Sequence, residues 1–242
     1  MNGFASYLLF GSPGVGKATQ GEVLGTILGF YHCACGDVFR ALDLRMPLGH
    51  QFTEFSSKGL LVPDELTIQL WQTTIDAQVS AGAFKPDIDA LVLDGIPRNL
   101  RQAQLMEGLI DVRHVFHLLC QDREELIQRL RKRALHDNRL DDASEKVIRP
   151  RLETYESETM PVLEFYREKL TTMDATQAPL KVVNRDHPRH LGSDTKDSMR
   201  MRALKAPFSE SILDVHRADA TAEFAEVSVT NRRSPFYERN TE

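Results

Sequence analysis

Cysteine is scarce in this sequence, and long apolar stretches are missing from it. The 242 residues contain three cysteines, Cys33, Cys35 and Cys120, which are too few and too unevenly spaced for a disulfide framework or a four-ligand zinc site. No apolar run approaches the roughly 20 residues that a membrane-spanning helix needs. No basic segment precedes a long apolar stretch at the start, so we expect no signal peptide. These absences favour a cytoplasmic protein without a membrane partner.

A surplus of positive charge is also missing. The formal net charge is −5, which gives no reason to expect nucleic acid as a partner. Hydrophobic residues make up 41% of the chain and charged residues 27%, which is typical of a globular protein. The length is compatible with one large domain that carries small insertions.

A glycine-rich stretch near the start is the most informative part of the sequence. Tyr7 to Phe10 form an apolar run that predicts a buried parallel strand, and the spacing G-x-x-x-x-G-K follows directly from Gly11 to Lys17. In such a loop, backbone N–H groups surround a phosphate, the lysine reaches the outer phosphates, and the next helix adds its positive N-terminal end. Ala18 stands where a serine or threonine usually offers a hydroxyl to magnesium. The residues predicted to hold nucleotide phosphates are Gly11, Gly14, Val15, Gly16, Lys17, Ala18 and Thr19.

Apolar strands alternate with helical segments along the chain, which predicts an α/β fold with a parallel sheet and helices on both faces. The expected strands are 7–10, 31–35, 91–93 and 112–120, with a brief strand or turn that ends at 174. The expected helices are 17–29, 36–45, a short one within 48–61, 63–80, 99–110, 122–133 and 144–169. Pro150 lies inside the last helix, where it should cost about 3 kcal/mol or force a kink. Because ligands of such sheets bind at the carboxyl ends of the strands, we expect the glycine-rich loop and Asp94–Arg98 to share one crevice.

Further motifs accompany the phosphate loop. They are Gly36–Arg40 (GDVFR), Leu61–Glu65 (LVPDE), Leu93–Arg98 (LDGIPR), Arg139–Asp142 (RLDD) and Arg151–Tyr155 (RLETY). With these motifs, residues 4–183 resemble the adenylate kinase family of nucleoside monophosphate kinases in its short-lid form. The resemblance implies a P-loop kinase core over residues 1–186, a subdomain for the monophosphate at 36–65 and a lid at 134–142. Residues 187–242 lie beyond it, and their polar composition predicts a poorly packed or disordered tail.

The resemblance also implies a reaction and a role for each matching residue. The reaction is reversible, Mg²⁺-dependent transfer of a phosphoryl group from ATP to AMP, which gives two ADP. Residues that match the cluster around the transferred group are Lys17, Arg133, Arg139 and Arg151. Asp94 matches a carboxylate that organises Mg²⁺ through water, and Arg129 matches a residue that lies against the ATP base. Residues that match the acceptor site are Cys35, Arg40, Ser56, Val62, Gly95, Arg98 and Gln102. Among these, Arg40 and Arg98 would grip the monophosphate, and Gln102 would read its adenine.

Two alternatives to ATP:AMP transfer stay open at this stage. One is the same chemistry on UMP, CMP or another monophosphate, since Cys35 and Ser56 depart from the family's usual residues in the acceptor pocket. The other is a nucleotide-binding regulator without turnover that uses its tail to hold a partner. We further expect a monomer, no zinc in the short lid, and core packing rather than metal binding for Cys33 and Cys35. The basic residues expected to be ordinary surface charges are Arg101, Arg131 and Lys132.

Overall fold

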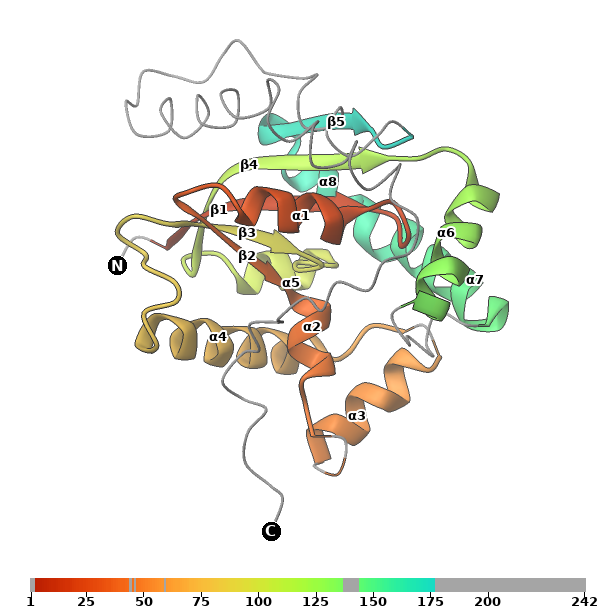
Figure 1. Ribbon diagram of the computed structural model, residues 1–242, viewed down its shortest axis with the longest axis horizontal. Coiled ribbons are helices and arrows are strands. Elements are labelled where there is room, and N and C mark those ends of the chain that lie inside the picture. The colour runs from red at the N-terminus through yellow and green to blue at the C-terminus, as the bar shows by residue number, and fades with distance from the viewer. Residues whose placement is uncertain (1–2, 44, 46, 59, 137–143, 177–242) are drawn as a thin grey trace, which may run out of the picture. The chain divides into compact units, whose positions relative to one another are not determined.

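A single five-stranded sheet lies at the centre of the computed structural model, which describes residues 3–43, 45, 47–58, 60–136 and 144–176. The chain divides into two units, residues 1–204 and 205–242, and all described residues belong to the first. The strand order is β2-β3-β1-β4-β5, and every neighbouring pair is parallel (Figure 1). The strands are β1 (Phe4–Gly11), β2 (Phe30–Ala34), β3 (Ala90–Asp94), β4 (Ile110–Leu119) and β5 (Leu170–Asp174).

Helices connect the strands. They are α1 (Lys17–Gly25), α2 (Cys35–Arg40), α3 (Pro47–Ser56), α4 (Asp64–Ser80), α5 (Leu100–Leu105), α6 (Arg123–His136), α7 (Glu145–Thr154) and α8 (Met160–Phe165). A π-helical turn, Tyr155–Thr159, joins α7 to α8, and a 3₁₀ turn, Arg167–Lys169, precedes β5. In the described part of the chain, no helix has both the length and the apolar character to cross a membrane.

The central strand β1 is buried on both faces, which explains its continuous apolar run. Successive side chains of a strand point to opposite faces. Leu8 and Phe10 therefore join a core cluster that also contains Trp71 of α4, whereas Tyr7 and Leu9 pack with α1 on the other side. Helices cover both faces of the sheet (Figure 1), and the predicted fold class is confirmed.

The order of the strands creates a crevice at their carboxyl ends. The chain leaves β1 toward β2 on one side, and it leaves β3 toward β4 on the other side of β1. Leu9 of β1 pairs with Asp94 of β3, so the loops that follow these two strands start next to each other. This is the topological switch point at which α/β sheets bind ligands. Helices α6 and α7 lie beyond the carboxyl end of β4 (Figure 1).

Several predicted boundaries were wrong. The single helix expected over 144–169 is α7, a π-helical turn, α8 and a 3₁₀ turn. The helix expected over 36–45 ends at Arg40, and Pro47 begins α3 instead of ending a helix. The helix expected over 99–110 ends at Leu105, since β4 already begins at Ile110. Cys35 is the first residue of α2 rather than the end of a strand, because the chain turns at the carboxyl end of the sheet.

Pro150 lies within α7, one turn after its start. Ser144 caps that helix, because its side-chain oxygen accepts a hydrogen bond from the backbone N–H of Lys146. Proline has no N–H to donate to the carbonyl four residues earlier, so α7 continues through Pro150 with one intrahelical bond fewer. Buried Ile148 and Leu152 flank it and hold α7 against α6.

Cys33 and Cys35 are buried in the core cluster that α4 covers, with 6% and 2% of their surface exposed. Both are free thiols. The predicted core packing of these two residues is confirmed.

Candidate active site

One cavity of about 740 Å³ opens at the switch point of the sheet. Every predicted site residue that the structure describes lines it, whereas Arg139 and positions 137–142 of the expected lid lie outside the described residues. Residues from the predicted phosphate site that line it are Gly11, Gly14, Val15, Gly16, Lys17, Ala18 and Thr19. The other predicted residues that line it are Cys35, Arg40, Ser56, Val62, Asp94, Gly95, Arg98, Gln102, Arg129, Arg133 and Arg151.

The glycine-rich loop between β1 and α1 needs glycine for two different reasons. Gly16 caps α1 with a φ of 103°, a left-handed conformation that side chains disfavour. Gly14 also has a positive φ, 84°, and a Cβ atom there would lie 2.8 Å from the backbone oxygen of Leu126. Backbone N–H groups of the first turn of α1 have no partner within the helix. The loop therefore brings N–H groups and a helix N-terminus to the cavity, the arrangement that binds phosphates.

Lys17 folds back over this loop. Its Nζ donates hydrogen bonds to the carbonyl oxygens of Gly11 at 2.8 Å and Ser12 at 3.2 Å. Burial lowers the pKa of Lys17 from 10.5 to about 8; Asp94 opposes this effect, and three nearby arginines, including Arg98, add to it. The other two are Arg133 and Arg151. Lys17 thus lies where an anion would relieve the repulsion between cations.

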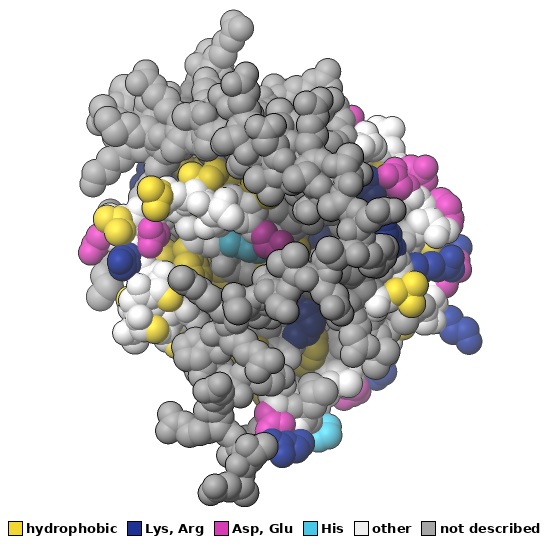
Figure 2. All heavy atoms as spheres, in the orientation of Figure 1, with side chains coloured by type: hydrophobic (Ala, Val, Ile, Leu, Met, Phe, Trp, Pro, Cys, Tyr) yellow, Lys and Arg dark blue, Asp and Glu magenta, His cyan; other side chains and the backbone are white. Residues whose placement is uncertain are grey.

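Positive charge gathers in the cavity although the chain as a whole is acidic. Seven basic side chains and three carboxylates of the described residues line it. Lys132 is one of the seven, although it is exposed, as expected for a surface charge. By contrast, Arg131 pairs with Glu145 at 2.5 Å on the surface of α6 and α7, where Figure 2 shows basic and acidic side chains side by side. The predicted surface role of Arg131 is confirmed.

Asp94 is the buried carboxylate of the cavity, with 8% of its surface exposed, and it ends strand β3. Within the described ranges no group of three or more His, Cys, Asp or Glu side chains is arranged to hold a metal ion. Mg²⁺ keeps several waters and needs only one or two carboxylates when nucleotide phosphates supply the other ligands. A single carboxylate among basic residues therefore fits Mg²⁺ that arrives with a nucleotide.

Two further arginines of the cavity are held by their neighbours. Arg40 donates to Asp37 at 2.5 Å, and Arg98 donates through Nε to the carbonyl oxygen of Gly95 at 2.8 Å. Cys35 forms part of the wall, and burial raises the pKa of its thiol to about 11, so the thiol is neutral at physiological pH. Gln102 is almost fully buried, with 1% of its surface exposed.

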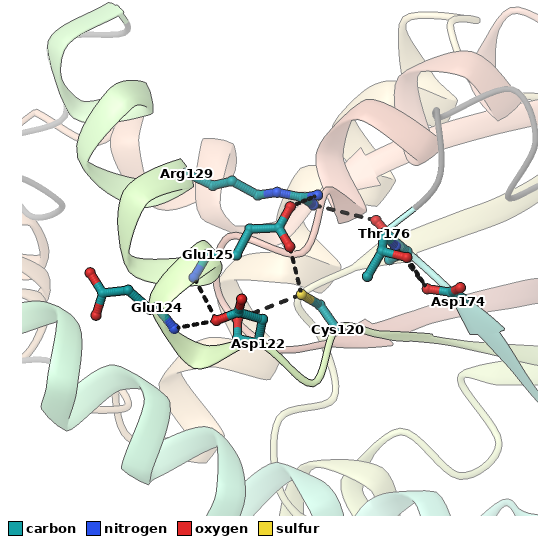
Figure 3. Close-up of polar contacts among 8 residues, drawn as sticks. Cys120, Asp122, Glu124, Glu125, Arg129, Asp174 and Thr176 are labelled. Carbon is teal, nitrogen blue, oxygen red and sulfur yellow. Dashed lines mark hydrogen bonds and ion pairs between the residues drawn. The ribbon is translucent and has the colours of Figure 1, made fainter.

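Arg129 lines the same cavity and projects from α6 toward the turn after β5 (Figure 3). Its Nη2 donates to Glu125 at 2.5 Å, and its Nη1 donates to the carbonyl oxygen of Ala175 at 3.4 Å. The Glu125 carboxylate also accepts a weak hydrogen bond from the thiol of Cys120 at 3.8 Å. Arg129 is therefore held in place by two elements that come together only in the folded protein.

The sequence analysis missed residues of the π-helical turn that line the same cavity. The hydroxyl of Tyr155 hydrogen-bonds Nε2 of His117 on β4 at 3.1 Å. The hydroxyl of Thr159 donates to the carbonyl oxygen of Arg98 at 2.7 Å. Tyr155 closes the RLETY motif, so its place in that motif was the available signal. Thr159 and His117 carried no signal in the sequence.

Comparison with known proteins agrees with this geometry. A family model described as adenylate kinase matches residues 9–171. An adenylate kinase from Cyanothece sp. (strain PCC 7425) is 40% identical over 182 residues, which cover 72% of this chain and 88% of the relative. Adenylate kinases from Thermobifida fusca and Prochlorococcus marinus (strain MIT 9211) are 36% and 38% identical; each alignment covers 67% of this chain, with 84% and 83% of the relative.

The family match spans the glycine-rich loop, Asp94 and the arginines of the cavity. It covers about two thirds of the chain, and the similarity extends over most of each relative's length. The chain therefore belongs to the adenylate kinase family, a family of nucleoside monophosphate kinases.

Proposed function

We propose that this protein transfers a phosphoryl group from Mg·ATP to AMP, reversibly, and so produces two ADP. The observation that carries the proposal is one cavity that is lined both by a phosphate-binding loop and by arginines from other elements. Two anionic nucleotides can face each other only where positive charge surrounds both. The names of the relatives, all adenylate kinases, support AMP as the acceptor.

The proposed chemistry relies on positioning and charge neutralisation. An oxygen of the AMP phosphate attacks the γ-phosphorus of ATP, the bond from that phosphorus to the β–γ bridging oxygen breaks, and ADP leaves. No general base is needed, because the attacking oxygen is already anionic. In this proposal Lys17 and the loop hold the donor phosphates, while Arg40 and Arg98 hold the acceptor phosphate. The residues proposed to neutralise the charge of the transition state are Arg133, Arg139 and Arg151.

Magnesium, when bound with ATP, supplies further charge neutralisation at the phosphates. Asp94 is the residue that we propose to hold it, through water. Arg129, fixed between Glu125 and Ala175, is proposed to lie against the ATP base, where a guanidinium plane can stack.

The experiment that tests the proposal is a coupled assay of the purified full-length chain with Mg·ATP and five monophosphates: AMP, UMP, CMP, GMP and dTMP. We expect fast turnover with AMP. Turnover with a pyrimidine monophosphate alone would support the type of reaction and contradict AMP as the acceptor. Tight binding of ATP without turnover on any monophosphate would favour a nucleotide-binding regulator.

We also propose that the enzyme is a cytoplasmic monomer. Three buried free thiols, Cys33, Cys35 and Cys120, are consistent with a reducing compartment. Light scattering of the purified chain during size exclusion measures its mass directly. A mass near 27.4 kDa would support a monomer, and twice that mass would contradict it.

A further inference from the structure

The side-chain amide of Gln102 is held at both of its ends. Its Oε1 accepts a hydrogen bond from the backbone N–H of Arg98 at 2.7 Å, and its Nε2 donates one to Oδ1 of Asp64 at 2.9 Å. The same Oδ1 accepts a hydrogen bond from Nδ2 of Asn99 at 2.9 Å. Gln102 lines the cavity, whereas Asp64, at the start of α4, does not.

These contacts fix which way the amide points. A glutamine amide can usually rotate by half a turn, which exchanges its oxygen and nitrogen with little change in shape. In this structure the rotation would place Oε1 of Gln102 against the carboxylate of Asp64, which only accepts hydrogen bonds. It would also place Nε2 against the N–H of Arg98, so that two donors would face each other. Both exchanged contacts are repulsive, and the amide is therefore locked.

Because its orientation is fixed, the amide of Gln102 has one defined arrangement of hydrogen-bond donor and acceptor left for a ligand. Each of its contacts uses one hydrogen-bonding position, so one lone pair of Oε1 and one N–H of Nε2 remain. Adenine offers an amino donor beside a ring nitrogen that accepts. A 6-oxo purine, such as hypoxanthine or guanine, reverses this order, with a carbonyl acceptor beside a protonated ring nitrogen. A freely rotating amide would pair with both orders, whereas a locked amide pairs with one.

We propose that Asp64 is a positioning residue that makes the acceptor site selective for a 6-amino over a 6-oxo purine monophosphate, by locking the amide of Gln102. This inference rests on the proposed function, in which Gln102 faces the acceptor base. The same lock would distinguish CMP from UMP if the acceptor were a pyrimidine, because cytosine and uracil differ by the same exchange of donor and acceptor.

The test compares the full-length wild type with Asp64→Asn. An asparagine amide keeps the size of the carboxylate but removes its charge, so the bond that holds Nε2 of Gln102 becomes weaker while the N–H of Arg98 still holds Oε1. We measure kcat/KM for AMP and for IMP with saturating Mg·ATP. The wild type should strongly prefer AMP, and the ratio of the two values should fall by about tenfold in Asp64→Asn, the expected effect of one hydrogen bond. The KM for ATP should stay unchanged.

The matched control is Glu65→Gln, which makes the same chemical change at the next residue. Glu65 is exposed and pairs with Arg101 at 3.2 Å on the surface, so this variant should keep the selectivity of the wild type. Asp64→Glu, which keeps a carboxylate that only accepts, should retain most of the selectivity. We also measure the thermal unfolding midpoint of each variant. A purely structural role of Asp64 would lower this midpoint and leave the AMP:IMP ratio unchanged.

Three outcomes would overturn the inference. An unchanged AMP:IMP ratio in Asp64→Asn would show that the lock does not set selectivity. Equal kcat/KM values of the wild type for AMP and IMP would show that the acceptor site has no such selectivity. Absence of transfer to every monophosphate would instead overturn the proposed function, and this inference with it.

Discussion

Lys17 lies in the phosphate loop at a position where its own charge is costly. Burial removes water from its ammonium group, and three arginines repel it, so its pKa falls to about 8 despite the carboxylate of Asp94. A bound triphosphate supplies the missing negative charge and favours the protonated lysine. Binding of ATP is therefore coupled to the protonation of Lys17.

The coupling predicts that ATP binding takes up protons near pH 8. In the free protein about half of the Lys17 side chains are unprotonated at that pH, so binding should take up roughly half a proton per site. Affinity should be constant below about pH 7 and should fall as the pH rises through 8. Isothermal titration calorimetry at pH 8 in buffers of different ionisation enthalpy measures the uptake. Lys17→Arg, which stays charged, should abolish it, and a wild type without uptake would contradict the prediction.

Arg98 combines a guanidinium that lines the cavity with a backbone that two other side chains hold. We predict that Arg98→Ala raises the KM for AMP and lowers kcat/KM by roughly ten- to a hundredfold, the value of a charge-assisted hydrogen bond. The KM for ATP should not change. Arg101→Ala is the matched control, because Arg101 pairs with Glu65 on the surface. Kinetics of Arg98→Ala that equal those of the wild type would remove this residue from the acceptor site.

At the scale of an element, the π-helical turn Tyr155–Thr159 lines the cavity and bonds two other parts of the chain. Its first residue bonds His117 on β4, and its last residue bonds the backbone of Arg98. Arg151 lies one turn earlier, in α7. Interruptions of this kind often occur at functional sites, because the extra residue turns side chains toward new partners. The turn thereby connects the helix that carries Arg151 to the backbone of Arg98.

We predict that Thr159→Val weakens this connection. Valine keeps the shape of threonine but removes the hydroxyl, so the carbonyl oxygen of Arg98 loses its partner. The expected cost is about 1–3 kcal/mol of unfolding free energy, together with a raised KM for AMP. Chemical denaturation and steady-state kinetics measure the two effects. Thr73→Val is the control, since the Thr73 hydroxyl bonds a carbonyl on the exposed side of α4. An equal loss in both variants would show that the turn has no special role.

The same turn shows where prediction from the sequence failed. The alternation of apolar runs and helical segments predicted the parallel sheet, because strands buried on both faces have a continuous apolar pattern. The segment 144–169 has helical composition throughout, so one helix was expected. Its division depends on Tyr155 and Thr159 finding partners 38 and 61 residues away, and local composition does not contain that information.

The candidate site, like the fold, was predictable only in part. The spacing of Gly11 to Lys17 predicted the phosphate loop, because a tight turn around a phosphate requires glycine at particular places. Parallel strands share one carboxyl edge, which explains why Asp94 could be predicted beside that loop. The contacts that orient the site were not predictable, since Asp64 meets Gln102, and Arg129 meets Ala175, only after the chain has folded.

At the scale of the whole molecule, the described fold and its cavity occupy only part of the chain. The family model matches residues 9–171, and the last strand of the sheet ends at Asp174. The described residues that line the cavity lie between Leu9 and Ala175. Residues 187–242, the tail expected from the sequence, lie outside the described residues. The contacts that we have derived for the active site therefore need no residue of the tail.

We predict that a variant truncated after residue 186 retains the activity of the full-length chain. Its kcat and both KM values should stay within about twofold of the wild type, because no described interaction of the cavity is removed. A second variant, truncated after residue 204, ends where the first of the two units ends and serves as the control. Loss of activity in the shorter variant alone would assign a necessary contact to residues 187–204. Loss in both would show that residues 205–242 complete the enzyme, and the core proposed for residues 1–186 would then be too small.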